Sequence, residues 1–161
     1  MSPHQVEHLS GKRVLAAGKF DILHLGHLAY LEQAKELAGE DGELVVVIAL
    51  DSTIKQERGA PPVFPQEQRK RLVEALGMVD RAVLGLETTD HSDIVSEIKP
   101  DIIALGYDQY TDTDRLQGKI SEMSLETKIT RLGKKTAGGL CSSSMIRERI
   151  LRYYRENGRA K

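Results

Sequence analysis

Two histidines three residues apart are the clearest chemical feature of this 161-residue chain. They stand in His24-Leu25-Gly26-His27, and the segment just before them is Gly18-Lys19-Phe20-Asp21. At a helix start, side chains three positions apart share a face, and free backbone N–H groups favour an anion. A glycine between the two imidazoles leaves room for a phosphate chain. The segment predicts a phosphate cradle; the competing interpretation is that both histidines only cap the helix or pack in the core.

Cationic side chains follow in two further places. Lys55 and Arg58 lie in the segment 51–62, which the sequence predicts to be a loop after a buried strand. Two cations there suit the phosphate of an acceptor substrate, although a merely solvated basic loop would look the same. Arg69 stands in line with the apolar stripe of a predicted helix, so its side chain points inward and needs an anionic partner.

Two later segments carry hydroxyl, amide and carboxylate groups. The first segment is Gly106-Tyr107-Asp108-Gln109, which predicts a turn. This turn either lies beside the base and ribose of a nucleotide or is an ordinary turn. The second follows two glycines and opens the last predicted helix; it is Ser142-Ser143-Ser144. Hydroxyls and N–H groups at a helix start converge on an anion, whereas helix capping alone needs one serine and not three.

Five short apolar runs predict the strands that position these segments. Their bounds are 13–17, 44–50, 81–84, 101–105 and 128–132. Segments with helical spacing lie between them, and a clear helical stripe of Ile146, Ile150 and Tyr154 follows the fifth run. This alternation predicts an α/β fold, a Rossmann-like doubly wound five-stranded parallel sheet with helices on both faces. The domain should span 13–156, with flexible termini at 1–12 and 157–161.

The location of the predicted site follows from this architecture. In open parallel sheets, ligands bind beyond the carboxyl ends of the strands. The segment 18–27, the segment 51–62 and the turn at 106–109 each come directly after a predicted strand. The sequence therefore predicts that they share one edge of the sheet.

Composition argues against several classes of partner. The formal net charge of −1 gives no general attraction to nucleic acid or to a membrane surface. No apolar run approaches the roughly 20 residues that span a bilayer, and the N-terminal segment lacks the apolar region of a signal peptide. The single cysteine, Cys141, fits a reducing compartment. We therefore expect a cytoplasmic protein with no nucleic-acid or membrane partner.

The segments 18–21 and 24–27 together resemble the signature of the cytidylyltransferase-like nucleotidyltransferases, with Lys19 in place of the usual threonine. The resemblance implies binding of a nucleoside triphosphate and transfer of its nucleotidyl group to an acceptor phosphate, with release of pyrophosphate. It also implies that Lys55 contacts phosphates at the reacting centre and that Arg69 contacts those of the nucleotide. Residues 141–144 are similar to an Ile-Ser-Thr-Thr-like segment that holds the triphosphate in that family, with Cys141 in place of the aliphatic residue.

The expected site residues fall into three groups. The catalytic group is His24, His27, Lys55 and Arg69. The nucleotide-binding group is Gly18, Lys19, Phe20, Asp21, His24, Gly26, His27, Gly106, Tyr107, Asp108, Gln109, Ser142, Ser143 and Ser144. The acceptor-binding group is Lys55 and Arg58. A divalent metal ion, Mg²⁺, should arrive with the triphosphate, and we expect no metal site made by the protein alone.

The acceptor is indicated by longer stretches. Residues 49–53, 59–69 and 98–109 resemble the archaeal FAD synthases, which implies ATP and FMN as substrates and a possible homodimer. Two alternatives stay open. One is another transferase of the superfamily, such as a cytidylyltransferase acting on glycerol 3-phosphate or a pantetheine-phosphate adenylyltransferase. The other is a non-catalytic nucleotide sensor, which could dispense with both histidines.

Overall fold

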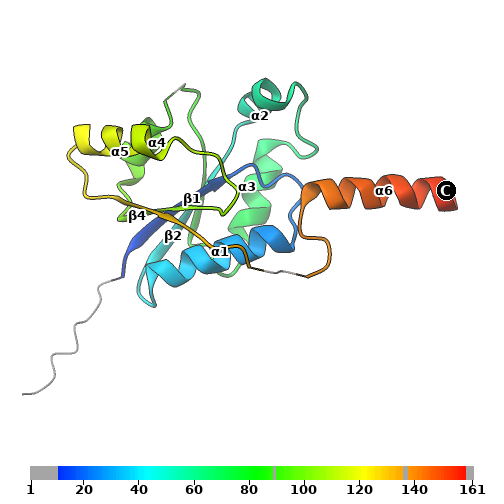
Figure 1. The fold of residues 1–161 in the computed structure, drawn as a ribbon, viewed down its shortest axis with the longest axis horizontal. Helices are drawn as coiled ribbons and strands as arrows, with labels where there is room; N and C mark the ends of the chain where they lie inside the picture. The colour runs from blue at the N-terminus through cyan, green and yellow to red at the C-terminus, as the bar shows by residue number, and fades with distance from the viewer. Residues whose placement is uncertain (1–10, 89, 136–137, 159–161) are drawn as a thin grey trace, which may run out of the picture.

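The computed structural model describes residues 11–88, 90–135 and 138–158 (Figure 1). The strands are β1 (Arg13–Gly18), β2 (Glu43–Ile48), β3 (Arg81–Leu84), β4 (Ile102–Leu105) and β5 (Lys128–Arg131). The helices are α1 (Leu25–Ala38), α2 (Asp51–Arg58), α3 (Gln66–Glu74), α4 (Ser92–Ile98), α5 (Thr113–Glu122) and α6 (Ser143–Asn157). Residues 1–10 and 159–161, most of the termini predicted to be flexible, lie outside the described residues.

The strands form one parallel sheet in the order β3-β2-β1-β4-β5. The chain builds outward from β1 to β3, crosses back, and continues on the other side of β1 with β4 and β5. The prediction of a five-stranded, doubly wound parallel sheet is confirmed, and each strand lies at a predicted apolar run. The order reverses between β1 and β4, which is where such sheets bind ligands.

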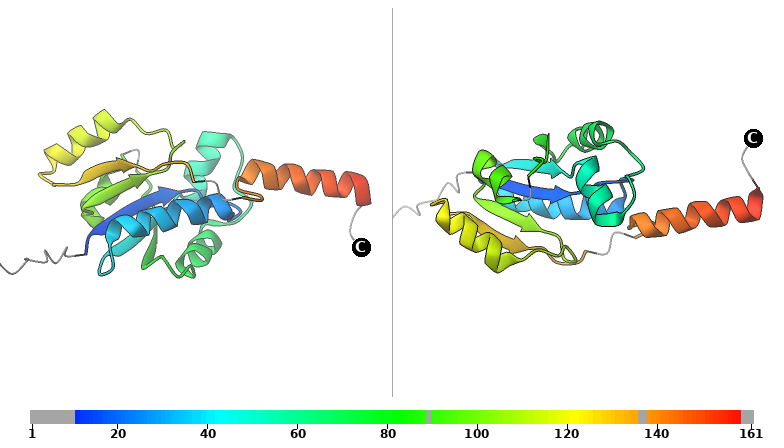
Figure 2. Two further views of the ribbon diagram at one scale, coloured as in Figure 1. Left: turned by 60° about the horizontal axis from the view of Figure 1, so that its bottom comes forward. Right: turned by 90° about the horizontal axis from the view of Figure 1, so that it is seen from above.

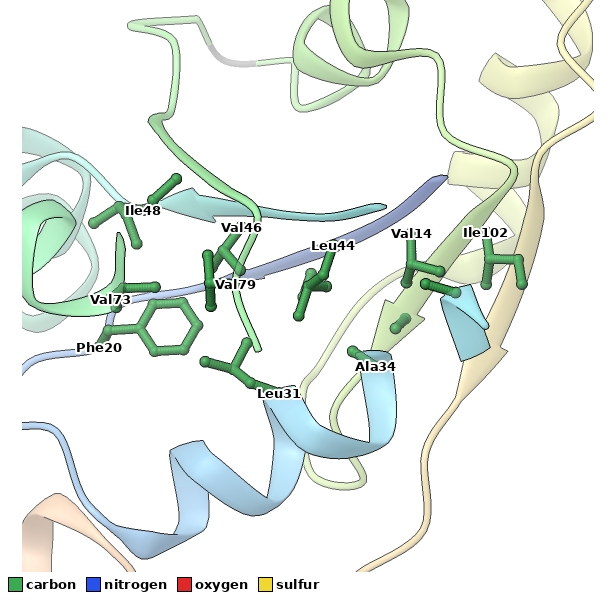
Figure 3. Packing of buried hydrophobic residues seen from close by; sticks show 14 of the residues in the cluster. Val14, Phe20, Leu31, Ala34, Leu44, Val46, Ile48, Val73, Val79 and Ile102 are labelled. Carbon is green, nitrogen blue, oxygen red and sulfur yellow. The ribbon is translucent and has the colours of Figure 1, made fainter. Parts of the chain in front are cut away.

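Two apolar clusters cover the two faces of the sheet because successive strand side chains point to opposite sides. Val14 and Val46 belong to the cluster that packs on α1 and α3, whereas Leu15 and Val45 belong to the one that packs on α4 and α5. Phe20 also lies in the first cluster (Figure 3). The predicted helices on both faces are confirmed, and the loop after β1 is thereby anchored in the core.

The prediction of a loop over 51–62 is wrong for its first part, which forms α2. Only Ile54 of this helix is buried, so the helix leaves no apolar stripe in the sequence. The sequence nevertheless contains signals for both ends of this helix. Asp51 lies in the first turn, cations lie in the last, and Gly59 ends the helix in a left-handed conformation, with φ of 73°.

The last helix forms as predicted, but α6 contains no buried residue. It leaves the body of the protein near the start of α1 and extends away from the sheet (Figures 1 and 2). Its apolar side chains are therefore exposed, including Ile150, Leu151 and Tyr153. Within the described part of the chain, no helix is both long and apolar enough to cross a membrane.

Candidate active site

The two histidines stack at the start of α1, with ring centroids 3.7 Å apart. His24 is the N-cap, and its Nδ1 accepts a hydrogen bond from the His27 N–H at 3.3 Å. His27 Nδ1 accepts from the His24 N–H in return, at 3.4 Å. Because both Nδ1 atoms are acceptors, each neutral ring carries its proton on Nε2. The capping interpretation is thus correct for Nδ1, and both rings retain an Nε2–H donor for a ligand.

Both imidazoles are neutral at pH 7. Burial lowers the pKa of His24 below its usual 6.5. Burial also lowers the pKa of His27 to about 3; the neighbouring His24 adds to this effect, and Asp21 opposes it. The pair therefore offers hydrogen-bond donors with a fixed tautomer rather than titrating charges.

This arrangement predicts a pH dependence of stability. An unfolded histidine takes up a proton below pH 6.5, whereas folded His27 stays neutral down to about pH 3. The contribution to stability is therefore fully present above pH 6.5 and is lost as the pH falls toward 3. Between pH 7 and 5, we expect the free energy of unfolding to fall by about 2 kcal/mol more than in His27→Asn. Urea titrations at both pH values measure this difference, and parallel pH profiles would contradict it.

The loop after β1 is held in a strained conformation. Phe20 and Ile22 have φ of 50° and 62°, a left-handed region that bulky residues rarely adopt. Asp21, 3% exposed, accepts hydrogen bonds from the N–H groups of Val63 and Phe64 at 2.9 and 3.0 Å. Phe20 and Asp21 thus support the loop from inside the protein, and their predicted contact with the nucleotide stays a prediction.

Arg69 has a fully buried side chain, and its guanidinium joins three segments around the site. It donates to the Phe64 carbonyl at 2.9 Å, to the Lys19 carbonyl at 2.6 Å and to Asp51 Oδ1 at 2.7 Å. The prediction of an inward arginine with an anionic partner is confirmed, and the partner is the first residue of α2. Contact between Arg69 and nucleotide phosphates stays a prediction, since its guanidinium already orients the loop after β1.

The other predicted cations meet the same loop from α2. Lys19 pairs with Glu57 at 2.7 Å, and Arg58 lies 3.9 Å from the buried carboxylate of Asp21. Lys55 is exposed on α2. The structure therefore brings Lys19 and Arg58 to one cluster, and the acceptor-binding role of Lys55 and Arg58 stays a prediction.

The serine segment meets the start of α1 through Gly26. A Cβ atom at Gly26 would collide with the carbonyl oxygen of Cys141. This contact with protein backbone is a structural reason for glycine at this position, and the predicted approach of a phosphate chain to Gly26 stays a prediction. The contact brings the N-termini of α1 and α6 together. Ser142 caps α6 by accepting from the Met145 N–H at 3.2 Å, as one serine of the predicted row should.

The turn after β4 is fastened to β5 by an arginine that sequence reasoning missed. Arg131 Nη1 donates to the carbonyls of Gly106 and Gln109 at 2.9 and 2.8 Å. Gln109 closes the turn, because its Oε1 accepts from the Gly106 N–H at 3.2 Å. Tyr107 and Asp108 are exposed. The sequence feature that could have identified Arg131 is its position as a cation at the carboxyl end of the last strand.

Comparison with known proteins places these features in a family. The cytidylyltransferase-like family model matches residues 15–149. The FAD synthase of Methanothrix thermoacetophila is 47% identical over 140 residues, covering 87% of this chain and 94% of that protein. The FAD synthase of Thermoplasma volcanium is 48% identical over 139 residues, covering 86% and 94%.

A solved structure shows the same fold. A crystal structure from Thermoplasma volcanium, described as a lipopolysaccharide core biosynthesis protein, matches with a TM-score of 0.72 at 48% identity. The match covers 78% of this chain and 99% of that one. The sheet, the paired histidines and the near full-length matches agree, and the chain belongs to the cytidylyltransferase-like family, as a relative of the archaeal FAD synthases.

Proposed function

We propose that this protein is an FMN adenylyltransferase, which transfers AMP from ATP to the phosphate of FMN and yields FAD and pyrophosphate. The observation that carries the proposal is the pair of neutral, Nε2-protonated histidines at the start of α1. This pair lies in a chain that covers 94% of two proteins named FAD synthase. The identity of the acceptor is inferred from the similarity to these two proteins, and the phosphate chemistry is inferred from the histidine pair.

The reaction needs alignment more than it needs a base. A phosphate oxygen of FMN forms a bond to the α-phosphorus of ATP, and the bond from that phosphorus to the bridging oxygen breaks, so pyrophosphate leaves with its electron pair. The FMN phosphate loses its second proton near pH 6, so at neutral pH it attacks without help from a side chain. Catalysis then consists of in-line positioning and of neutralising charge on the leaving group.

Some residues of the site are each assigned to the phosphates of one of the two substrates. We assign the Nε2–H groups of His24 and His27 to phosphate oxygens of ATP, which they meet as neutral donors. Two helix N-termini support the same anion, and Ser143 and Ser144 add hydroxyls beside them. Lys55 is assigned to the FMN phosphate.

The remaining assignments follow the two loops beside the histidine pair. Gly18 and Lys19 form one wall of the nucleotide site, and the turn from Gly106 to Gln109 forms the wall beside the base. Arg58 joins Lys55 in binding the acceptor.

A divalent ion fits a site of this composition when it arrives with ATP. Within the described residues, no group of three or more histidine, cysteine, aspartate or glutamate side chains could hold a metal ion. Mg²⁺ commonly keeps several waters and takes its remaining ligands from substrate phosphates and one or two carboxylates. When bound, it would neutralise triphosphate charge, while the neutral imidazoles of His24 and His27 would donate hydrogen bonds to the same phosphates.

The experiment that tests the proposal offers ATP or CTP together with FMN or glycerol 3-phosphate to the purified protein with Mg²⁺. Pyrophosphate is followed over time, and products are separated by chromatography. We expect FAD from ATP and FMN and no product from the other three combinations. A CDP-linked product would overturn the flavin assignment and keep the transferase, whereas nucleotide binding without pyrophosphate release would indicate a sensor. The homodimer and the cytoplasmic location stay predictions, and light scattering tests the first.

A further inference from the structure

The sheet opens between its central strand, β1, and the neighbouring strand β4. The pairing of β1 with β4 ends at Ala16 and Ala104. Each strand nevertheless remains paired on its outer side, β1 with β2 as far as Gly18 and β4 with β5 as far as Leu105. The strands therefore continue beyond the point at which they separate from each other, and the opening lies at the reversal of strand order.

The hydroxyl of Tyr30, on α1, lies in this opening. It donates to the Ala104 carbonyl at 2.7 Å and accepts from the Ala17 N–H at 3.2 Å. Ala49 N–H donates to the Gly18 carbonyl, so Gly18 directs its backbone groups toward β2 and the preceding Ala17 directs its own toward β4. In a parallel ladder with this register, the Ala17 N–H would next donate to the Ala104 carbonyl. The tyrosine oxygen is inserted into that hydrogen bond.

We propose that Tyr30 is a positioning residue that keeps the crevice between β1 and β4 open for the nucleotide. The inference rests on the proposed nucleotidyl transfer. The crevice separates the loop that follows β1 from the turn that begins at Gly106, the two walls assigned to ATP. Tyr30 also follows His27 by three residues on α1, so its hydroxyl and the imidazole lie on the same side of that helix. The Tyr30 side chain thus sets the distance between the two walls, and it also fixes their position relative to the histidine pair.

The chemistry of the hydroxyl suits a permanent spacer. Inserting it requires one group that both donates and accepts, which a phenol does and a phenyl ring does not. Burial raises the pKa of the Tyr30 hydroxyl, so it keeps its proton at any working pH. Its ring packs against the apolar cluster beneath β1, which holds the oxygen in place.

The test is Tyr30→Phe, which removes one oxygen and keeps the ring. Without the oxygen, Ala17 and Ala104 either pair directly and narrow the crevice or remain unsatisfied. We expect the KM for ATP to rise by roughly tenfold, with kcat and the KM for FMN unchanged. Tyr153→Phe is the matched control, because Tyr153 is exposed on α6 and loses the same oxygen. A fall in kcat at an unchanged KM for ATP would mean a merely structural role and would overturn the proposal.

Two further measurements separate this inference from the proposed reaction. Calorimetric titration with ATP alone should show the same loss of affinity in Tyr30→Phe, even if the wild-type protein makes no FAD. In the wild-type protein, NMR should show a slowly exchanging Tyr30 hydroxyl proton close to the Ala17 N–H, both before and after saturation with ATP. Loss of this proton signal on ATP binding, with β1 and β4 pairing directly, would overturn the spacer role whatever the variant does.

Discussion

Replacing His27 with asparagine should lower the rate of FAD formation by about 10²- to 10³-fold, the usual cost of one lost transition-state donor. The asparagine Oδ1 occupies the place of Nδ1, so it can still accept from the His24 N–H and keep the start of α1 capped. It has no group at the position of Nε2. Steady-state turnover with ATP and FMN measures the loss, and circular dichroism checks the fold. A variant with wild-type turnover would refute a catalytic role for His27.

His27→Gln is the complementary variant. Its amide nitrogen reaches the position of Nε2 and donates there, but the side chain has no acceptor at the position of Nδ1. We therefore expect turnover above that of His27→Asn and a less stable helix start. The opposite order of the two turnover values would mean that capping, rather than donation to phosphate, explains the need for this histidine.

Replacing Arg69 with methionine should remove about 3 kcal/mol or more from the free energy of unfolding. Arg69 is completely buried, and its loss leaves the carbonyls of Lys19 and Phe64 and the carboxylate of Asp51 without their donor. Both carbonyl contacts are partly buried, so much of the cost is that of acceptors left without a donor. Urea unfolding followed by circular dichroism measures the change, and a variant as stable as wild type would contradict the bracing role.

Asp51→Asn is the matched variant for this prediction. The Asp51 side chain is 41% exposed, so water can solvate it when its partner is changed. We expect Asp51→Asn to cost clearly less than Arg69→Met, because the two carbonyl contacts of Arg69 remain. If both variants cost the same, the ion pair would carry the whole effect and the carbonyl contacts would contribute nothing.

Local patterns in the sequence were sufficient for the strands and for the histidine pair. A buried parallel strand needs a continuous run of apolar residues, and such runs, as at 44–50, stand out from their flanks. The position of His24 and His27 at a helix start follows from the strand before them and the helical spacing after them. The helix α2 was missed because only Ile54 faces the core, and one apolar residue makes no period.

Partners that lie far apart along the chain were decided by the tertiary structure alone. Burial of Arg69 was predictable from its place in an apolar stripe, yet its pairing with Asp51 depends on how the fold places α2 next to α3. Gly26 carried a signal for close approach, and only the fold shows that the Cys141 carbonyl lies against it. No role was assigned to Tyr30 from the sequence. Its hydroxyl acquires a role because the register of β1 and β4 leaves two backbone groups facing each other across it, and register comes from packing rather than from any local pattern.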